Sequence, residues 1–126
     1  VFDLSMPPSQ LSGHDLPLIP TETMRWFYEH FLQGGEDPKD PKISPLYADL
    51  KGLPPSLITV GTNDPLLDDS LFMAARLRSA GCDVTLDIYP EGIHAFTVFP
   101  GAAGEIANDR ADNFITSCWD RSEQAL

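Results

Sequence analysis

Asp64 and His94 are the two residues in this sequence whose types and positions are best suited to catalysis. Asp64 follows the apolar run Leu57–Val60 in "LITVGTNDP", and His94 follows the alternating run in "DVTLDIYPEGIHAF". A carboxylate beside an imidazole fixes the tautomer of the ring and stabilises the imidazolium. If the two runs are neighbouring strands of one sheet, the sequence predicts a general base, His94, oriented by Asp64.

A structural explanation competes with the catalytic one for every other acid and histidine in these regions. Asp68 and Asp69 fit a role at the start of a helix, because carboxylates there interact favourably with the helix dipole and the free backbone amides. His14 lies in a proline-rich stretch, and His30 lies on the surface of a predicted helix. A single aspartate after a strand is also more often a turn former or cap, so the catalytic pair is a hypothesis with a structural alternative.

The elements that must position this pair alternate between strand and helix. Leu57–Val60 is too short for a helix and too apolar for a half-exposed strand, which predicts a strand buried on both faces of a parallel sheet. A helix is expected over about 69–80, a strand with one wetter face over 83–89, and a helix over about 103–119. A strand, a crossover helix and a second strand make a right-handed parallel unit, and ligands bind beyond the carboxyl ends of such strands.

The first part of the chain is predicted to contain little regular structure. Residues 3–20 have the proline, serine and glycine chemistry of a long surface loop. A helix follows over about 21–32, with Thr21 or Thr23 as its cap. Its apolar face is expected to be mainly core, with Trp26 and Phe27 as possible neighbours of a pocket; the residues at helical spacing are Met24, Phe27, Tyr28, Phe31 and Leu32.

Composition narrows the possible functions. The 126 residues include 8 Lys and Arg against 19 Asp and Glu, a net charge of -11, which disfavours binding to nucleic acid or to an anionic membrane surface. The sequence has no apolar run near the roughly 20 residues that a membrane-spanning helix needs. Cys82 and Cys118 suggest neither a disulfide framework nor a zinc site. The compartment stays open, with the reducing cytoplasm favoured.

A longer stretch, Ser44–Phe96, carries several motifs in a fixed order. It reads "SPLYADLKGLPPSLITVGTNDPLLDDSLFMAARLRSAGCDVTLDIYPEGIHAF" and resembles the C-terminal part of the hormone-sensitive-lipase-like family of α/β-hydrolases, which comprises esterases and lipases. In that family a "DPL..D" segment bears the acid of a catalytic triad, and an "H.F" segment bears the base. The resemblance therefore implies Asp64 as the acid and His94 as the base.

The same resemblance implies an α/β fold with parallel strands, crossover helices and an incomplete sheet. Residues 1–126 are then one C-terminal fragment of a single domain, with a loop-rich excursion over 1–56 and a β-α-β-α unit over 57–126. The absence of an initiator methionine before Val1 is interpreted as a missing N-terminal portion. The family's serine nucleophile lies in a GxSxG turn and its oxyanion hole in an HGGG-like loop, and neither motif occurs in the sequence. The resemblance implies a serine esterase without metal or organic cofactor, and we expect these residues alone to be inactive.

Two other functions remain open. One is a serine peptidase of the prolyl-oligopeptidase type, which also carries Asp and then His near its end. The other is a non-catalytic relative that binds a ligand or partner. For the esterase, the expected partners are a small acyl ester and the missing N-terminal half of the fold. Without that half, the unpaired edge of Leu57–Val60 is expected to favour self-association.

Overall fold

A computed structural model describes residues 1–124, without the side chains of residues 122 and 124. The chain divides into two units, Val1–His94 and Ala95–Leu126, and each is described by itself. The first unit contains α1 (Pro8–Leu11), α2 (Thr21–Phe31), the 3-10 turn η1 (Pro45–Tyr47), β1 (Ser56–Asn63), α3 (Leu67–Ser79) and β2 (Val84–Ile93). The second contains the 3-10 turn η2 (Phe96–Val98) and α4 (Ala102–Gln124).

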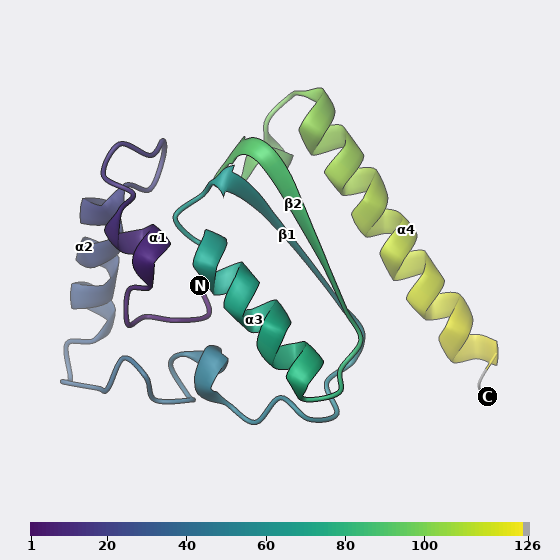
Figure 1. Cartoon of the computed structure of the whole chain (residues 1–126), viewed down its shortest axis with the longest axis horizontal. Coiled ribbons are helices and arrows are strands. Elements are labelled where there is room, and N and C mark those ends of the chain that lie inside the picture. The colour runs from purple at the N-terminus through teal and green to yellow at the C-terminus, as the bar shows by residue number, and fades with distance from the viewer. Residues whose placement is uncertain (125–126) are drawn as a thin grey trace. The chain divides into compact units, whose positions relative to one another are not determined.

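The centre of the first unit is a parallel pair of strands joined by a crossover helix. β1 and β2 pair in parallel, with Ser56 opposite Val84 at the start of the ladder. The helix α3 connects them and lies along the strand pair (Figure 1). The predicted α/β class and the order of strand, helix and strand are therefore confirmed.

The crossover helix is held by a small apolar core. Met73, Ala74 and Leu77 are buried on the stripe of α3 that the helical spacing predicts. Arg76 adds a polar tie, because its guanidinium donates hydrogen bonds to the backbone carbonyls of Leu46 and, at 3.1 Å, Ala48. The buried members of the cluster between α3 and the segment around η1 are Leu46, Leu50, Met73 and Leu77. This core fixes the segment that leads into β1 against the helix that follows β1.

The expectation that the first strand is buried on both faces is wrong for this chain. Residues 56–59 of β1 are half-buried, Val60 and Gly61 are buried, and Thr62 and Asn63 are exposed. Within residues 1–124 the sheet has two strands, so β1 is paired along one edge only. Burial on both faces of a parallel strand needs more strands and helices than these residues supply.

The helix predicted over about 21–32 forms as α2, called the aromatic helix below, but its cap and the burial of its side chains differ from expectation. The N-cap position of α2 is Pro20, and no side chain caps the helix. Thr21 is instead the first helical residue, and its buried hydroxyl donates to the carbonyl of Gln10 at 2.6 Å. Met24 and Tyr28 are buried, whereas Phe31 is 65% exposed. The apolar face is thus core along one side only.

The second unit places a long helix after a short turn. α4 extends from Ala102 to Gln124, beyond the predicted 103–119. The helical spacing of the apolar residues predicts that Ala107 and Ile115 both face inward. Ala107 is buried, but Ile115 is 63% exposed, so the prediction is wrong for Ile115. Within the unit, the Asn108 side chain donates to the carbonyl of Thr97 at 3.0 Å and ties α4 to η2.

Candidate catalytic dyad

The structure brings His94 and Asp64 into direct contact. The Nδ1 atom of His94 lies 3.2 Å from Oδ1 and 3.1 Å from Oδ2 of Asp64, so Nδ1–H donates to the carboxylate. The Asp64 side chain is 9% exposed and that of His94 is 33% exposed. A buried carboxylate that binds Nδ1 leaves Nε2 as the ring nitrogen that can exchange a proton with another group.

The contact follows from the register of the two strands. The last pair of the parallel ladder joins Asn63 of β1 to Ile93 of β2. Asp64 and His94 are the next residue on each strand, so they leave the sheet side by side at its carboxyl edge. This is the position at which ligands bind in open α/β sheets.

Asp64 also organises the turn that starts α3. Its Oδ1 accepts a hydrogen bond from the backbone amide of Leu66 at 2.8 Å, and its backbone carbonyl accepts one from Leu67 at 3.1 Å. The turn-forming role and the contact with His94 therefore coexist in one carboxylate. The bond from Leu66 to Oδ1 holds the side chain of Asp64 in the rotamer that points at the imidazole, and the backbone bond from Leu67 closes the turn.

Asp68 and Asp69 lie in the first turn of α3 as predicted, but their side chains do not cap it. Asp69 is 1% exposed and accepts hydrogen bonds from the amides of Phe2 at 2.7 Å and Asp3 at 2.9 Å, and from the side-chain amide of Gln10 at 2.6 Å. Burial raises the pKa of the Asp69 carboxyl, against the opposing effect of these donors. Asp69 therefore anchors the beginning of the chain to α3.

A buried polar network, which no pattern in the sequence predicts, connects this anchor to α2. Gln10 is fully buried, and its Oε1 accepts the hydroxyl proton of Tyr28 at 2.9 Å while its amide donates to Asp69. Burial raises the pKa of the Tyr28 phenol, and the charge of Asp69 adds to the effect. A single glutamine in a four-residue helix with proline at its start gives no periodic signal, so the loop predicted over residues 3–20 is wrong at α1.

The other two histidines have different partners. Nδ1 of the exposed His14 lies 2.6 Å from Oε1 of Glu22, and Nδ1 of His30 donates to the carbonyl of Trp26 at 2.7 Å. The His14 pair is more than half exposed on both sides, where an ion pair contributes little. Among the residues that the structure describes, His94 is the histidine that faces a buried carboxylate.

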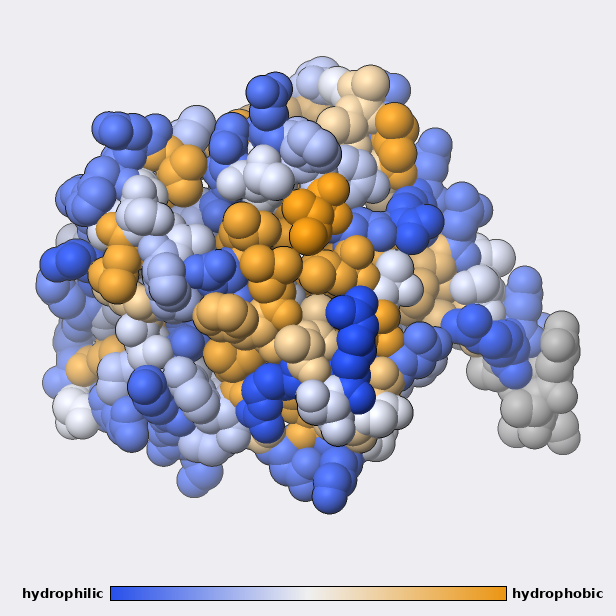
Figure 2. Space-filling model, viewed as in Figure 1, coloured by the Kyte–Doolittle hydropathy of each residue, from blue (hydrophilic) through white to orange (hydrophobic). Residues whose placement is uncertain are grey.

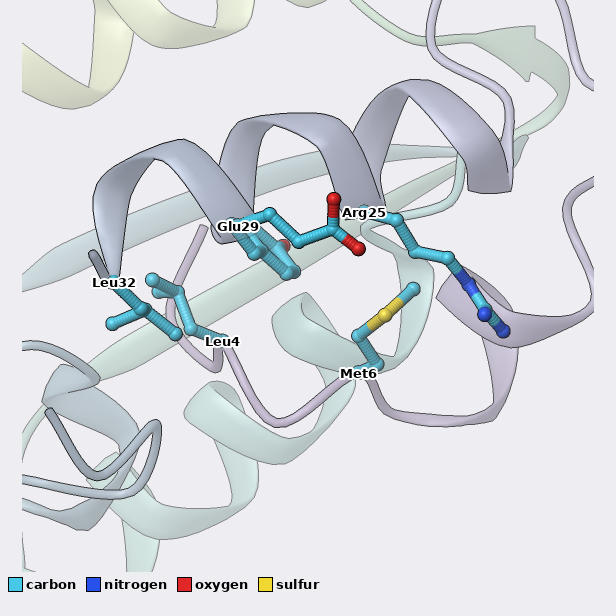
Figure 3. A pocket seen from close by; sticks show the side chains of 6 residues that line it. Leu4, Met6, Arg25, Glu29 and Leu32 are labelled. Carbon is cyan, nitrogen blue, oxygen red and sulfur yellow. The ribbon is translucent and has the colours of Figure 1, made fainter. Parts of the chain in front are cut away.

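A cavity of about 490 Å³ lies between the aromatic helix and the beginning of the chain (Figure 3). The close-up shows Leu32 and Leu4 at one end of it and Met6 beside Arg25 at the other, with Glu29 above. Tyr28 completes the lining. Asp64 and His94 are not among the lining residues, so this cavity is separate from the dyad.

The described residues contain neither a candidate metal site nor a candidate membrane-spanning helix. Over residues 1–124, no three His, Cys, Asp or Glu side chains gather in an arrangement that could hold a metal ion. Among the helices in the same range, none is both long and apolar enough to cross a membrane.

Comparison with known proteins identifies the family. Residues 3–98 match the model of the family described as "alpha/beta hydrolase fold". An esterase of Acinetobacter venetianus is 35% identical over 106 residues, which are 82% of this chain and 35% of that protein. Human hormone-sensitive lipase is 46% identical over 61 residues, which are 46% of this chain and 6% of that protein.

The fold agrees with a solved structure of the same kind. A hormone-sensitive lipase from a metagenome library superimposes with a TM-score of 0.85 at 37% identity, over 91% of this chain and 40% of that one. The present chain thus spans well under half the length of these relatives. The family match, the sequence identity and the superposition agree, and the chain belongs to the hormone-sensitive-lipase-like family of α/β-hydrolases.

Proposed function

We propose that this chain is the acid-and-base part of a serine carboxylic ester hydrolase. The observation that carries the proposal is the contact between His94 Nδ1 and the buried Asp64 carboxylate at the carboxyl edge of the sheet. The esterases and lipases among the relatives support the substrate class. In this assignment His94 is the general base and Asp64 orients it.

The reaction divides into two acyl transfers. In the first, Nε2 of His94 takes the proton of a serine hydroxyl as the serine oxygen bonds to the ester carbonyl carbon. The imidazolium then gives this proton to the departing alkoxide as the carbon–oxygen bond of the ester breaks. In the second, His94 takes a proton from water, the hydroxide displaces the serine oxygen, and serine recovers its proton. Asp64 stabilises the imidazolium in both halves.

The serine and the oxyanion donors must come from a segment that these 126 residues do not contain. No serine of the sequence has glycines two positions before and two positions after it, and no HGGG-like run occurs. Stabilisation of the developing oxyanion is usually the largest single contribution to acyl transfer. We therefore propose that the 126-residue chain alone is inactive and that the dyad acts only within a complete enzyme.

We propose that the rest of the complete protein covers the exposed apolar surface of this chain. Apolar side chains gather over the middle of the face seen in Figure 2. Large apolar side chains that are exposed in the first unit include Phe72 of α3 and Ile88 of β2. β1 has one unpaired edge among the described residues. Surfaces of this kind associate with further strands or with other copies. The isolated chain should accordingly self-associate in sedimentation analysis; a monodisperse monomer would count against this partner.

A comparison of substrates tests the proposed activity. The complete enzyme should hydrolyse p-nitrophenyl acetate with an acyl-enzyme burst, and the 126-residue chain at equal concentration should not exceed the buffer rate. Cleavage of a prolyl amide with no cleavage of the ester would favour the peptidase alternative. Binding without turnover of either substrate would favour the non-catalytic relative.

A further inference from the structure

The two strands do not keep a constant register up to the dyad. Gly61 pairs with Tyr89, but the next pair is Asn63 with Ile93. β1 advances by two residues over this interval while β2 advances by four, so β2 carries two additional residues between Tyr89 and Ile93, just ahead of His94. With an unbroken register Asp64 would stand beside Gly92. The irregularity in β2 is what brings His94, rather than Gly92, to Asp64.

Gly61 makes the irregularity possible because it leaves room for the backbone of Gly92. A Cβ atom at Gly61 would lie 2.0 Å from the carbonyl oxygen of Gly92 and 2.3 Å from its carbonyl carbon. Both atoms belong to backbone, so they cannot rotate away as a flexible side chain would. Any residue other than glycine at position 61 must push Gly92, two residues before His94, away from β1.

Thr62, the next residue of β1, bonds directly to the irregular segment of β2. Glu91 lies in the left-handed region, at φ 58°, which is unfavourable for a residue with a side chain. Its backbone amide donates to the Thr62 hydroxyl at 2.8 Å. The bond gives the amide of this irregular segment an acceptor that the interrupted ladder does not provide. The conformation at Glu91 is thus tied to β1 at the residue that follows Gly61.

We propose that Gly61 and Thr62 are positioning residues for His94. They hold the two additional residues of β2 in the one conformation that sets Nδ1 of His94 against Asp64. Neither residue reacts with the substrate; each acts through the path of the backbone between Tyr89 and His94. The proposal rests on the proposed role of His94 as the base.

Gly61→Ala in the complete enzyme is the principal test. With p-nitrophenyl acetate, kcat should fall about 10- to 100-fold while KM changes little, because a small displacement of a catalytic group costs this much without affecting ground-state binding. The matched control is Gly34→Ala, whose added Cβ would first meet the carboxylate of Glu36, the end of an exposed side chain that can turn away. A folded Gly61→Ala enzyme with the kcat of the control would overturn the proposal.

If Gly61→Ala does not fold, two variants of Thr62 test the positioning role instead. Thr62→Val removes the acceptor with little change of shape and should lower kcat about 2- to 10-fold, the rate equivalent of one hydrogen bond. Thr62→Ser keeps a hydroxyl acceptor and should therefore keep the kcat of the parent enzyme. Thr85→Val, at the other end of β2, is the control. Equal kcat for Thr62→Val, Thr62→Ser and Thr85→Val would contradict a positioning role.

One readout separates this proposal from the proposed function. The proton on Nδ1 of His94, bonded to Asp64, should give a low-field resonance in the proton NMR spectrum, and Gly61→Ala should shift or remove it irrespective of turnover. If the resonance changes but His94→Ala and Asp64→Asn leave hydrolysis intact, the proposed function fails, and only the effect of Gly61 on the contact between His94 and Asp64 remains. If the resonance is unchanged, the positioning role fails on its own.

Discussion

Ser9 donates its hydroxyl proton to the backbone carbonyl of Pro65, the residue after Asp64, at 2.7 Å. The same Ser9 oxygen accepts the amide proton of Asp68 at 3.1 Å, and the Ser9 amide donates to the Asp68 carboxylate at 2.8 Å. Three hydrogen bonds therefore join one residue of the short helix α1 to the turn between Asp64 and α3. This turn sets the direction of the Asp64 side chain, so α1 supports the dyad from a distance of more than fifty residues in sequence.

Ser9→Ala should weaken this support. It removes one donor and one acceptor at a half-buried position, which is expected to cost about 1–2 kcal/mol in the free energy of unfolding. In the complete enzyme kcat should fall severalfold as the Asp64 turn loosens. Urea denaturation and ester hydrolysis measure the two effects. Ser12→Ala is the control, because Ser12 bonds only to Pro8 in an exposed part of the same segment. If Ser9→Ala changed stability and kcat no more than Ser12→Ala does, Ser9 would not stabilise the turn that follows Asp64.

Asp69→Ala should destabilise the first unit strongly. It leaves the amides of Phe2 and Asp3 and the side-chain amide of Gln10 without their carboxylate acceptor in a buried site. The expected loss is about 2–4 kcal/mol in the free energy of unfolding. Asp83→Ala, which removes an exposed carboxylate, should change stability by less than about 0.5 kcal/mol. Similar urea midpoints for the two variants would show that Asp69 is no anchor.

Stability should fall at alkaline pH because of Tyr28. Burial, followed by the charge of Asp69, raises the pKa of its phenol above the ordinary value in the folded chain. An unfolded tyrosine ionises near pH 10, so above that pH the unfolded state has lost a proton that the folded state keeps. The contribution of Tyr28 to the free energy of unfolding is fully present below about pH 10 and declines as the pH rises toward the pKa of Tyr28 in the folded chain.

Tyr28→Phe should remove the part of the alkaline loss of stability that comes from ionisation of Tyr28. It also leaves the buried Oε1 of Gln10 without a donor, which is expected to cost about 1–3 kcal/mol at neutral pH. Urea midpoints at about pH 8 and about pH 11 for both proteins measure the two effects. If the midpoint of the variant declined as steeply as that of the parent chain, Tyr28 would not be the responsible group.

The sequence was sufficient to predict the order of the main elements and the two candidate residues. Hydrophobic runs and their periodicity mark β1, α3, β2 and α4, because burial of apolar side chains repeats with the period of each element. Proximity of Asp64 and His94 follows from one further rule, that parallel strands present their carboxyl ends at the same edge. The contact itself is seen in the structure, while its catalytic use remains a prediction.

The features that escaped prediction depend on contacts between distant residues. The buried Gln10 receives its partners from α2 and α3, so no pattern near position 10 marks it. The two additional residues of β2 are visible only when the register against β1 is known. Asp68 and Asp69 look alike in sequence, yet Asp69 is buried beneath Phe2 and Asp3 whereas Asp68 binds Ser9. Local sequence gives the elements, and tertiary packing decides which polar groups meet.

The central claim is that His94, oriented by Asp64, is the catalytic base. The most direct measurement is kcat of the complete enzyme for p-nitrophenyl acetate in His94→Ala, compared with His30→Ala, whose imidazole bonds only to its own helix. We expect kcat to fall about 10⁴-fold or more in His94→Ala, as when one member of a triad is removed, and to stay near that of the parent in His30→Ala. A His94→Ala enzyme within about tenfold of the His30→Ala enzyme would contradict the central claim.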